Sequence, residues 1–89
     1  MSVIAEFQDI ANKSVWLPHE VVKATLLGDV SLIRAWREYF GLTQQALAQR
    51  AGMSQPALAR LEKGDVKPRA ATLKKLAVAL GISVAQLIE

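Results

Sequence analysis

Residues typical of helix starts alternate with glycines typical of helix ends, and together they divide most of the chain into short segments. Hydroxyl side chains accept hydrogen bonds from the orphan N–H groups that begin a helix, and glycine takes the left-handed conformation that often ends one. The paired starts and stops are Ser31 and Gly41, Thr43 and Gly52, and Ser54 and Gly64, followed by the stop Gly81 and the start Ser83. Between them apolar residues recur three and four positions apart, which is the helical period. The pattern predicts an all-α fold with five short helices, the fourth from about Ala71 to Leu80.

The first thirty residues carry weaker signals. Residues 1–13 are expected to form a flexible arm or a short helix. Pro18 suits the first turn of a further helix that would run to about Leu27 and stop at Gly28. We therefore divide the chain into an N-terminal arm with a short helix at 1–30 and a compact helical domain at 31–89.

One stretch, from Gln44 to Lys63, is more specific than the rest. Two helices that meet at a steep angle across a very short turn need a small residue at the crossing, and Ala48 is suitably placed. The turn needs a residue that tolerates positive φ, and Gly52 is there. Both helices need inward apolar residues, which are Leu47, Ala51, Met53, Leu58 and Leu61.

Composition and charge narrow the classes of function. The 89 residues are 52% hydrophobic, enough for one compact core, and contain no cysteine for disulfides or thiolate metal sites. The net charge of +3 is uneven. Residues 1–30 hold two lysines against four acidic residues, whereas residues 31–89 hold nine Lys or Arg against four acidic residues. A basic folded domain suits a polyanion such as DNA, although a solvated positive surface would have the same composition.

Other classes are not favoured by the residues present. The first thirty residues lack the pattern of a signal peptide, and no apolar run has the length of a membrane span, so we expect a cytoplasmic protein with no membrane contact. His19 is the only histidine, so no metal site or cofactor is expected. No constellation of residues suggests a nucleophile or an acid–base pair, and an enzyme is not expected.

The domain at 31–89 resembles the Cro/XRE phage-repressor family of helix-turn-helix proteins. The resemblance is carried by Leu42-Thr43-Gln44, Leu47-Ala48, Ala51-Gly52, Ser54-Gln55, Leu58, Leu61-Glu62-Lys63-Gly64 and Ala79-Leu80-Gly81. It implies a five-helix bundle that binds double-stranded operator DNA, usually as a homodimer, with the third helix in the major groove.

That geometry assigns roles to the third helix. An amide can donate and accept at once, so Gln55 matches adenine, while the guanidinium of Arg60 matches guanine. The base-contacting set is Ser54, Gln55, Pro56, Ala59 and Arg60. The alternative for Gln55 and Arg60 is an exposed polar residue on a helix surface.

Phosphate contacts are expected from helix N-termini and basic loops. The expected residues are Thr43, Gln44, Lys63, Lys67 and Arg69. The remaining cations of the domain are more simply solvated charges, and these are Arg34, Arg50, Lys74 and Lys75. In the family an arginine of the first helix pairs with a glutamate late in the third, which implies a structural ion pair between Arg37 and Glu62.

The segment from Trp16 to Gln44 looks like HigA-like antitoxins of toxin–antitoxin operons. This implies a repressor of its own operon that also binds a small ribonuclease toxin, through an N-terminal surface of Trp16, Leu17, Val21 and Val22. Alternatives are a phage or plasmid repressor without a toxin, or a protein-interaction module on the same fold. The N-terminal helix could also simply complete the core. No separate ligand-sensing domain is expected, and the dimer surface is left open between the N-terminal arm and the C-terminal apolar residues Val84, Leu87 and Ile88.

Overall fold

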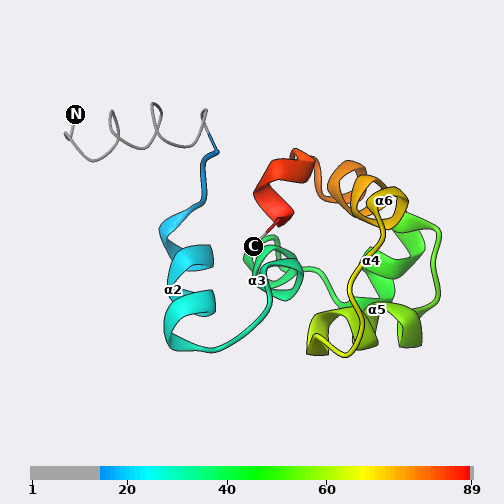
Figure 1. Cartoon of the computed structure of the whole chain (residues 1–89), viewed down its shortest axis with the longest axis horizontal. Helices are drawn as coiled ribbons and strands as arrows, with labels where there is room; N and C mark the ends of the chain where they lie inside the picture. Colours follow the sequence, from blue (N-terminus) through cyan, green and yellow to red (C-terminus); the bar gives the residue numbers. More distant parts are fainter. Residues whose placement is uncertain (1–14, 89) are drawn as a thin grey trace.

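The computed structural model describes residues 15–88, which form helices without any strand (Figure 1). The elements are α2 (His19–Leu27), α3 (Leu32–Tyr39), α4 (Gln44–Ala51), α5 (Gln55–Lys63), α6 (Ala70–Leu80) and a short 3₁₀ helix, η1 (Val84–Leu87). The all-α prediction is confirmed, and α3 to η1 are its five helices. The arm expected at residues 1–13 lies outside the described residues.

The helices begin and end largely at the residues that the sequence predicts. The hydroxyl oxygens of Ser31, Thr43 and Ser54 accept hydrogen bonds from backbone N–H groups three residues further on, at 3.0–3.2 Å. The glycines at the opposite ends have φ between 69° and 83°, and these are Gly41, Gly52, Gly64 and Gly81. A residue with a Cβ atom would be strained in that conformation, so the glycines help to fix where each helix stops.

Two features differ from the expectation, the start of α2 and the type of the last helix. Pro18 is the extended N-cap of α2 and lies just before the first turn. The end of α2 at Leu27 and Gly28 is confirmed, with Gly28 in a right-handed conformation and Asp29 in the left-handed one, with φ 56°. An aspartate tolerates this because its short polar side chain can hydrogen-bond locally. The fifth helix is a single 3₁₀ turn, which Ser83 and Gln86 close with a reciprocal capping box.

A single core joins all of these elements. Trp36 from α3, Leu47 from α4, Leu58 from α5 and Leu76 from α6 are its largest fully buried side chains. Val21 of α2 is buried in the same core, so α2 packs onto α3 (Figure 1). The expectation that Val21 meets a partner protein is therefore wrong, because no partner side chain can reach it.

The segment before α2 is attached to the C-terminal turn. The amide of Gln86 donates to the backbone oxygen of Trp16 at 2.7 Å, while the backbone oxygen of Gln86 accepts from the indole of Trp36 at 2.9 Å. The two indole rings meet edge to face, with centroids 6.4 Å apart. Leu17 packs against the core as a result. Along residues 15–88, no helix combines the length and apolar character needed to span a bilayer.

Candidate nucleic-acid interface

The turn between α4 and α5 sets the geometry of the surface. Gly52 caps α4 with φ 69°, and the N–H of Met53 donates back to the Ala48 oxygen at 2.9 Å. Ser54 then caps α5 immediately. Ala48 is buried and Met53 packs against the core, as the crossing of two close helices requires. The first turn of α5 is thereby held beside the first turn of α4.

A chain of side-chain hydrogen bonds links these two helix starts to the interior. Arg37 donates from Nε to Glu62 Oε2 at 2.7 Å and from Nη2 to Glu62 Oε1 at 3.1 Å. Gln44 Nε2 donates to the same Glu62 Oε1 at 3.0 Å. Gln55 Nε2 donates in turn to Gln44 Oε1 at 2.6 Å. Four residues from α3, α4 and α5 thus form one continuous polar chain.

Exposure rises along this chain. The side chain of Glu62 is 2% exposed and that of Arg37 is 12% exposed. Gln44 is half-buried, and Gln55 is exposed. The third donor of Arg37, Nη1, is satisfied by the Leu42 oxygen at 2.7 Å. A buried carboxylate is costly unless it is paired and hydrogen-bonded, and the three donors that converge on Glu62 meet that need. The buried end is therefore well placed to hold the exposed end still.

The structure places the other residues expected to touch bases on or beside the start of α5. Ser54 and Pro56 are exposed, with Ser54 also serving as the helix cap, and Ala59 is half-buried. Arg60 is exposed about one turn beyond Pro56. These residues and Gln55 belong to α5 or, for Ser54, to its N-cap, and among the contacts described only Gln55 is held by a side chain of a neighbouring helix.

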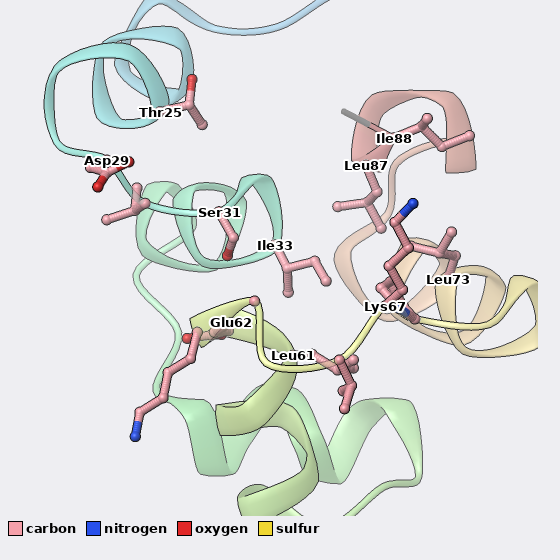
Figure 2. Close-up of a pocket in the computed structure, with 15 residues that line it drawn as sticks. Thr25, Asp29, Ser31, Ile33, Leu61, Glu62, Lys67, Leu73, Leu87 and Ile88 are labelled. Atoms are coloured by element: carbon pink, nitrogen blue, oxygen red, sulfur yellow. The ribbon is translucent and has the colours of Figure 1, made fainter.

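The residues expected to bind phosphate surround α4 and α5. Thr43 caps α4 through its hydroxyl, and Lys63 and Arg69 are exposed at the end of α5 and the start of α6. Lys67 is also exposed, but its side chain extends toward Leu87 and Ile88 (Figure 2). It lines a hollow of about 560 Å³ there, between α3, the loop after α5 and η1. The expectation that Lys67 binds phosphate stays a prediction.

A second ion pair on α3 provides a contrast with Arg37 and Glu62. Arg34 Nε donates to Glu38 Oε2 at 2.9 Å, with side chains 49% and 47% exposed. The hydrogen bond that Glu38 accepts, and then the negative charge of Glu38, hold the pKa of the Arg34 guanidinium above its ordinary value. Because water reaches both groups, this pair contributes little to stability. Arg34 belongs to the solvated surface, as the sequence suggested.

Two contacts were not found by sequence reasoning. The hydrogen bond between Gln44 and Gln55 joins residues that were each assigned only to DNA. The role of Gln86 was also missed, although the spacing of Ser83 and Gln86 is a capping-box pattern that could have indicated it. The side-chain contacts of Gln86 with the N-terminal segment have no local sequence signal.

Comparison with known proteins identifies the arrangement of α3 to η1. A family model described as "Helix-turn-helix" matches residues 33–87. A curated relative from Sinorhizobium fredii is 46% identical over 48 residues, which cover 54% of this chain and 62% of the relative. One from Haemophilus influenzae is 42% identical over 45 residues, 51% of this chain and 46% of that protein. One from Methanothermobacter thermautotrophicus is 41% identical over 51 residues, 57% and 74%. Each is named an uncharacterized HTH-type transcriptional regulator.

The extent of these matches is limited. The chain spans 62% and 46% of the length of the first two relatives. No solved structure gave a significant match to the chain.

Proposed function

This chain belongs to the helix-turn-helix family, and from that premise we propose that it represses transcription by binding a specific operator sequence with α5 in the major groove. The relatives named as transcriptional regulators support the general role. The basic balance of residues 31–89 supports a polyanionic partner.

The observation that carries the proposal is the position of Gln55. It lies exposed at the first position of α5, next to a glycine-containing turn that lets the helix start protrude. Its amide is held by Gln44, so less side-chain entropy is lost when it meets a base. In the major groove adenine offers an acceptor at N7 and a donor at N6, which an amide can satisfy together.

The surroundings of Gln55 suit contacts with phosphate when α5 lies in the major groove. The N-terminal turns of α4 and α5 carry no acidic residue, so their N–H groups present an unopposed positive end to the phosphate backbone. Lys63 and Arg69 flank this surface and fit the role of neutralising phosphates.

The test compares Gln55→Ala with Gln49→Ala, a control on the exposed part of α4 away from its first turn. Binding to a selected operator and to random DNA is measured at fixed salt. Gln55→Ala should weaken operator binding by about 1–3 kcal/mol and leave random DNA almost unchanged. Gln49→Ala should change neither. Equal weakening of both DNAs by Gln55→Ala would contradict direct readout.

The proposal includes binding as a homodimer to a two-fold operator. One helix reads only a few base pairs, too few for selectivity in a genome, and two copies double the sequence that is read. Half-sites should be separated by about one helical turn, roughly 10 base pairs. Footprinting that shows a single asymmetric half-site would argue against a dimer.

A finer proposal is that the repressor is an antitoxin that also binds a small basic ribonuclease. An exposed aromatic group supports it: Trp16 is 59% exposed and lies beside the Trp36 ring, which in turn contacts the exposed Tyr39 and Phe40. Aromatic side chains are frequent interface anchors, and acidic Glu20 and Glu38 line the neighbouring cleft between α2 and α3.

The structure sharpens the experiment for this partner. Removing residues 1–17 would take away Leu17 and the Trp16 oxygen that Gln86 binds, so the fold itself would suffer. Trp16→Ala keeps that oxygen and removes only the ring. Its control is Val78→Ala, at an exposed position of α6. The protein encoded beside this gene should co-purify with the wild type and the control but not with Trp16→Ala. If it binds none of the three, the protein is a repressor without a toxin.

A further inference from the structure

We infer that Glu62, which is buried beneath the DNA-binding surface, makes Gln55 select adenine and reject guanine by fixing the direction of the hydrogen bonds between them. This inference rests on the proposed function and adds a specificity-setting residue that does not itself touch DNA. It follows from the donor and acceptor chemistry of four side chains.

The first step concerns Glu62 and its two partners. An ionised carboxylate can only accept hydrogen bonds, and a guanidinium can only donate them. Arg37 donates to both carboxylate oxygens, which fixes the orientation of Glu62. Gln44 must therefore turn its NH₂ group toward Glu62, and it does so at 3.0 Å. The opposite orientation would place two oxygens against each other in a buried site.

The second step passes this orientation to the surface. With Nε2 of Gln44 committed to Glu62, its Oε1 faces Gln55 and can only accept. Gln55 consequently donates one hydrogen from Nε2, at 2.6 Å. Its Oε1 and its second N–H remain for the groove.

The third step is the comparison of the two purines. Adenine presents N7 as acceptor and N6–H as donor, which complements one N–H and one oxygen. Guanine presents two acceptors, N7 and O6, so the oxygen of Gln55 would face O6 without a hydrogen between them. If the hydrogen bonds ran in the reverse direction, Gln55 would accept a hydrogen bond from Gln44, and its whole NH₂ group would face the groove, which suits guanine. The buried end thus determines which purine is accepted.

A single substitution should reverse the direction of the hydrogen bonds between these side chains. In Glu62→Gln the new amide gives its oxygen to Arg37 Nε, which makes the shorter of the two hydrogen bonds, because Arg37 only donates. Its NH₂ group then takes the place of Oε1, gives up the hydrogen bond from Arg37 Nη2 and faces Gln44. Gln44 turns over, and Gln55 turns over after it. Gln44→Met removes the link altogether and leaves Gln55 free to rotate. Asp29→Asn removes the same kind of charge in the exposed turn after α2, away from these four residues, and is the control, because an asparagine keeps the left-handed conformation.

The experiment uses the full-length protein and a library of randomised duplex DNA. Sites are selected with the wild type, the base position that loses its preference in Gln55→Ala is located, and affinities are measured for adenine and guanine at that position. The wild type and Asp29→Asn should favour adenine by roughly 5- to 150-fold, the range expected for a bidentate contact. The ratio should fall at least about tenfold in Glu62→Gln, toward guanine, and should fall without reversal in Gln44→Met.

Two outcomes separate the inference from the function on which it rests. If Gln55→Ala changes no base preference, direct readout by Gln55 fails. If Gln55→Ala abolishes the preference but folded Glu62→Gln and Gln44→Met keep the full adenine-to-guanine ratio, the role of Glu62 is overturned. Circular dichroism establishes folding. Should Glu62→Gln fail to fold, Gln44→Met decides alone, because Gln44 is only half-buried.

Discussion

Replacing Arg37 with alanine should reveal how strongly the buried ion pair stabilises the fold. The change removes both guanidinium hydrogen bonds to Glu62 and the one to Leu42, and leaves the 2%-exposed carboxylate with Gln44 alone. Breaking a buried pair from one side costs about 3–5 kcal/mol. Because the cavity left by Arg37 opens to solvent and water can solvate part of the carboxylate, we expect the lower end, about 3 kcal/mol. For a domain of this size that lowers Tm by roughly 12–24 °C.

The assay is thermal and urea unfolding followed by circular dichroism, with Arg34→Ala as the matched control. Arg34 is the same residue type on the same helix and pairs with Glu38, but both side chains are about half exposed, so its removal should hardly change Tm. The double variant Arg37→Met, Glu62→Met removes both buried charges and should recover much of the loss. If Arg37→Ala and Arg34→Ala lower Tm equally, the reasoning about the buried carboxylate is refuted.

Two further predictions concern the DNA surface and the turn. Neutralising Arg69 should lower the salt slope of DNA binding by about one unit, whereas neutralising Lys67, which extends toward η1, should leave it nearly unchanged. Equal slopes for both variants would show that the direction of the Lys67 side chain does not keep it from DNA. Gly52→Ala places a Cβ atom at φ 69° and should destabilise the protein by roughly 1–2 kcal/mol in urea unfolding, even though open space surrounds the position; unchanged stability would show that the turn relaxes.

Much of the fold could be predicted because its signals are local. The caps Ser31, Thr43 and Ser54 act on backbone groups three residues away, and a glycine such as Gly52 acts on its own φ. A single sequence is enough to indicate such features. The end of α2 at Gly28 was predicted in the same way, but the left-handed conformation of Asp29, the residue after it, was not.

The contacts of the candidate site were less accessible from sequence. Gln44 and Gln55 were recognised one at a time, as surface residues with a role toward DNA. Their mutual hydrogen bond, and the third donor that Gln44 brings to Glu62, depend on how three helices pack. Similarly, apolar Val21 on a short helix fits a partner surface or a core equally well, and only the packing of α2 on α3 distinguishes them.

The hydrogen bond from Gln86 to Trp16 has a consequence for the order in which the chain folds. It joins residues 70 positions apart, whereas the α4–α5 pair depends on contacts within about twenty residues. Short loops close at a lower entropic cost than long ones, so the turn and its two helices can form early, even during synthesis. The hydrogen bond between Gln86 and Trp16 can form only after Gln86 has left the ribosome. During that interval α5 can already be formed, while Trp16 and Trp36 still lack their hydrogen bonds with Gln86. The N-terminal aromatic surface is therefore most accessible in the newly made chain.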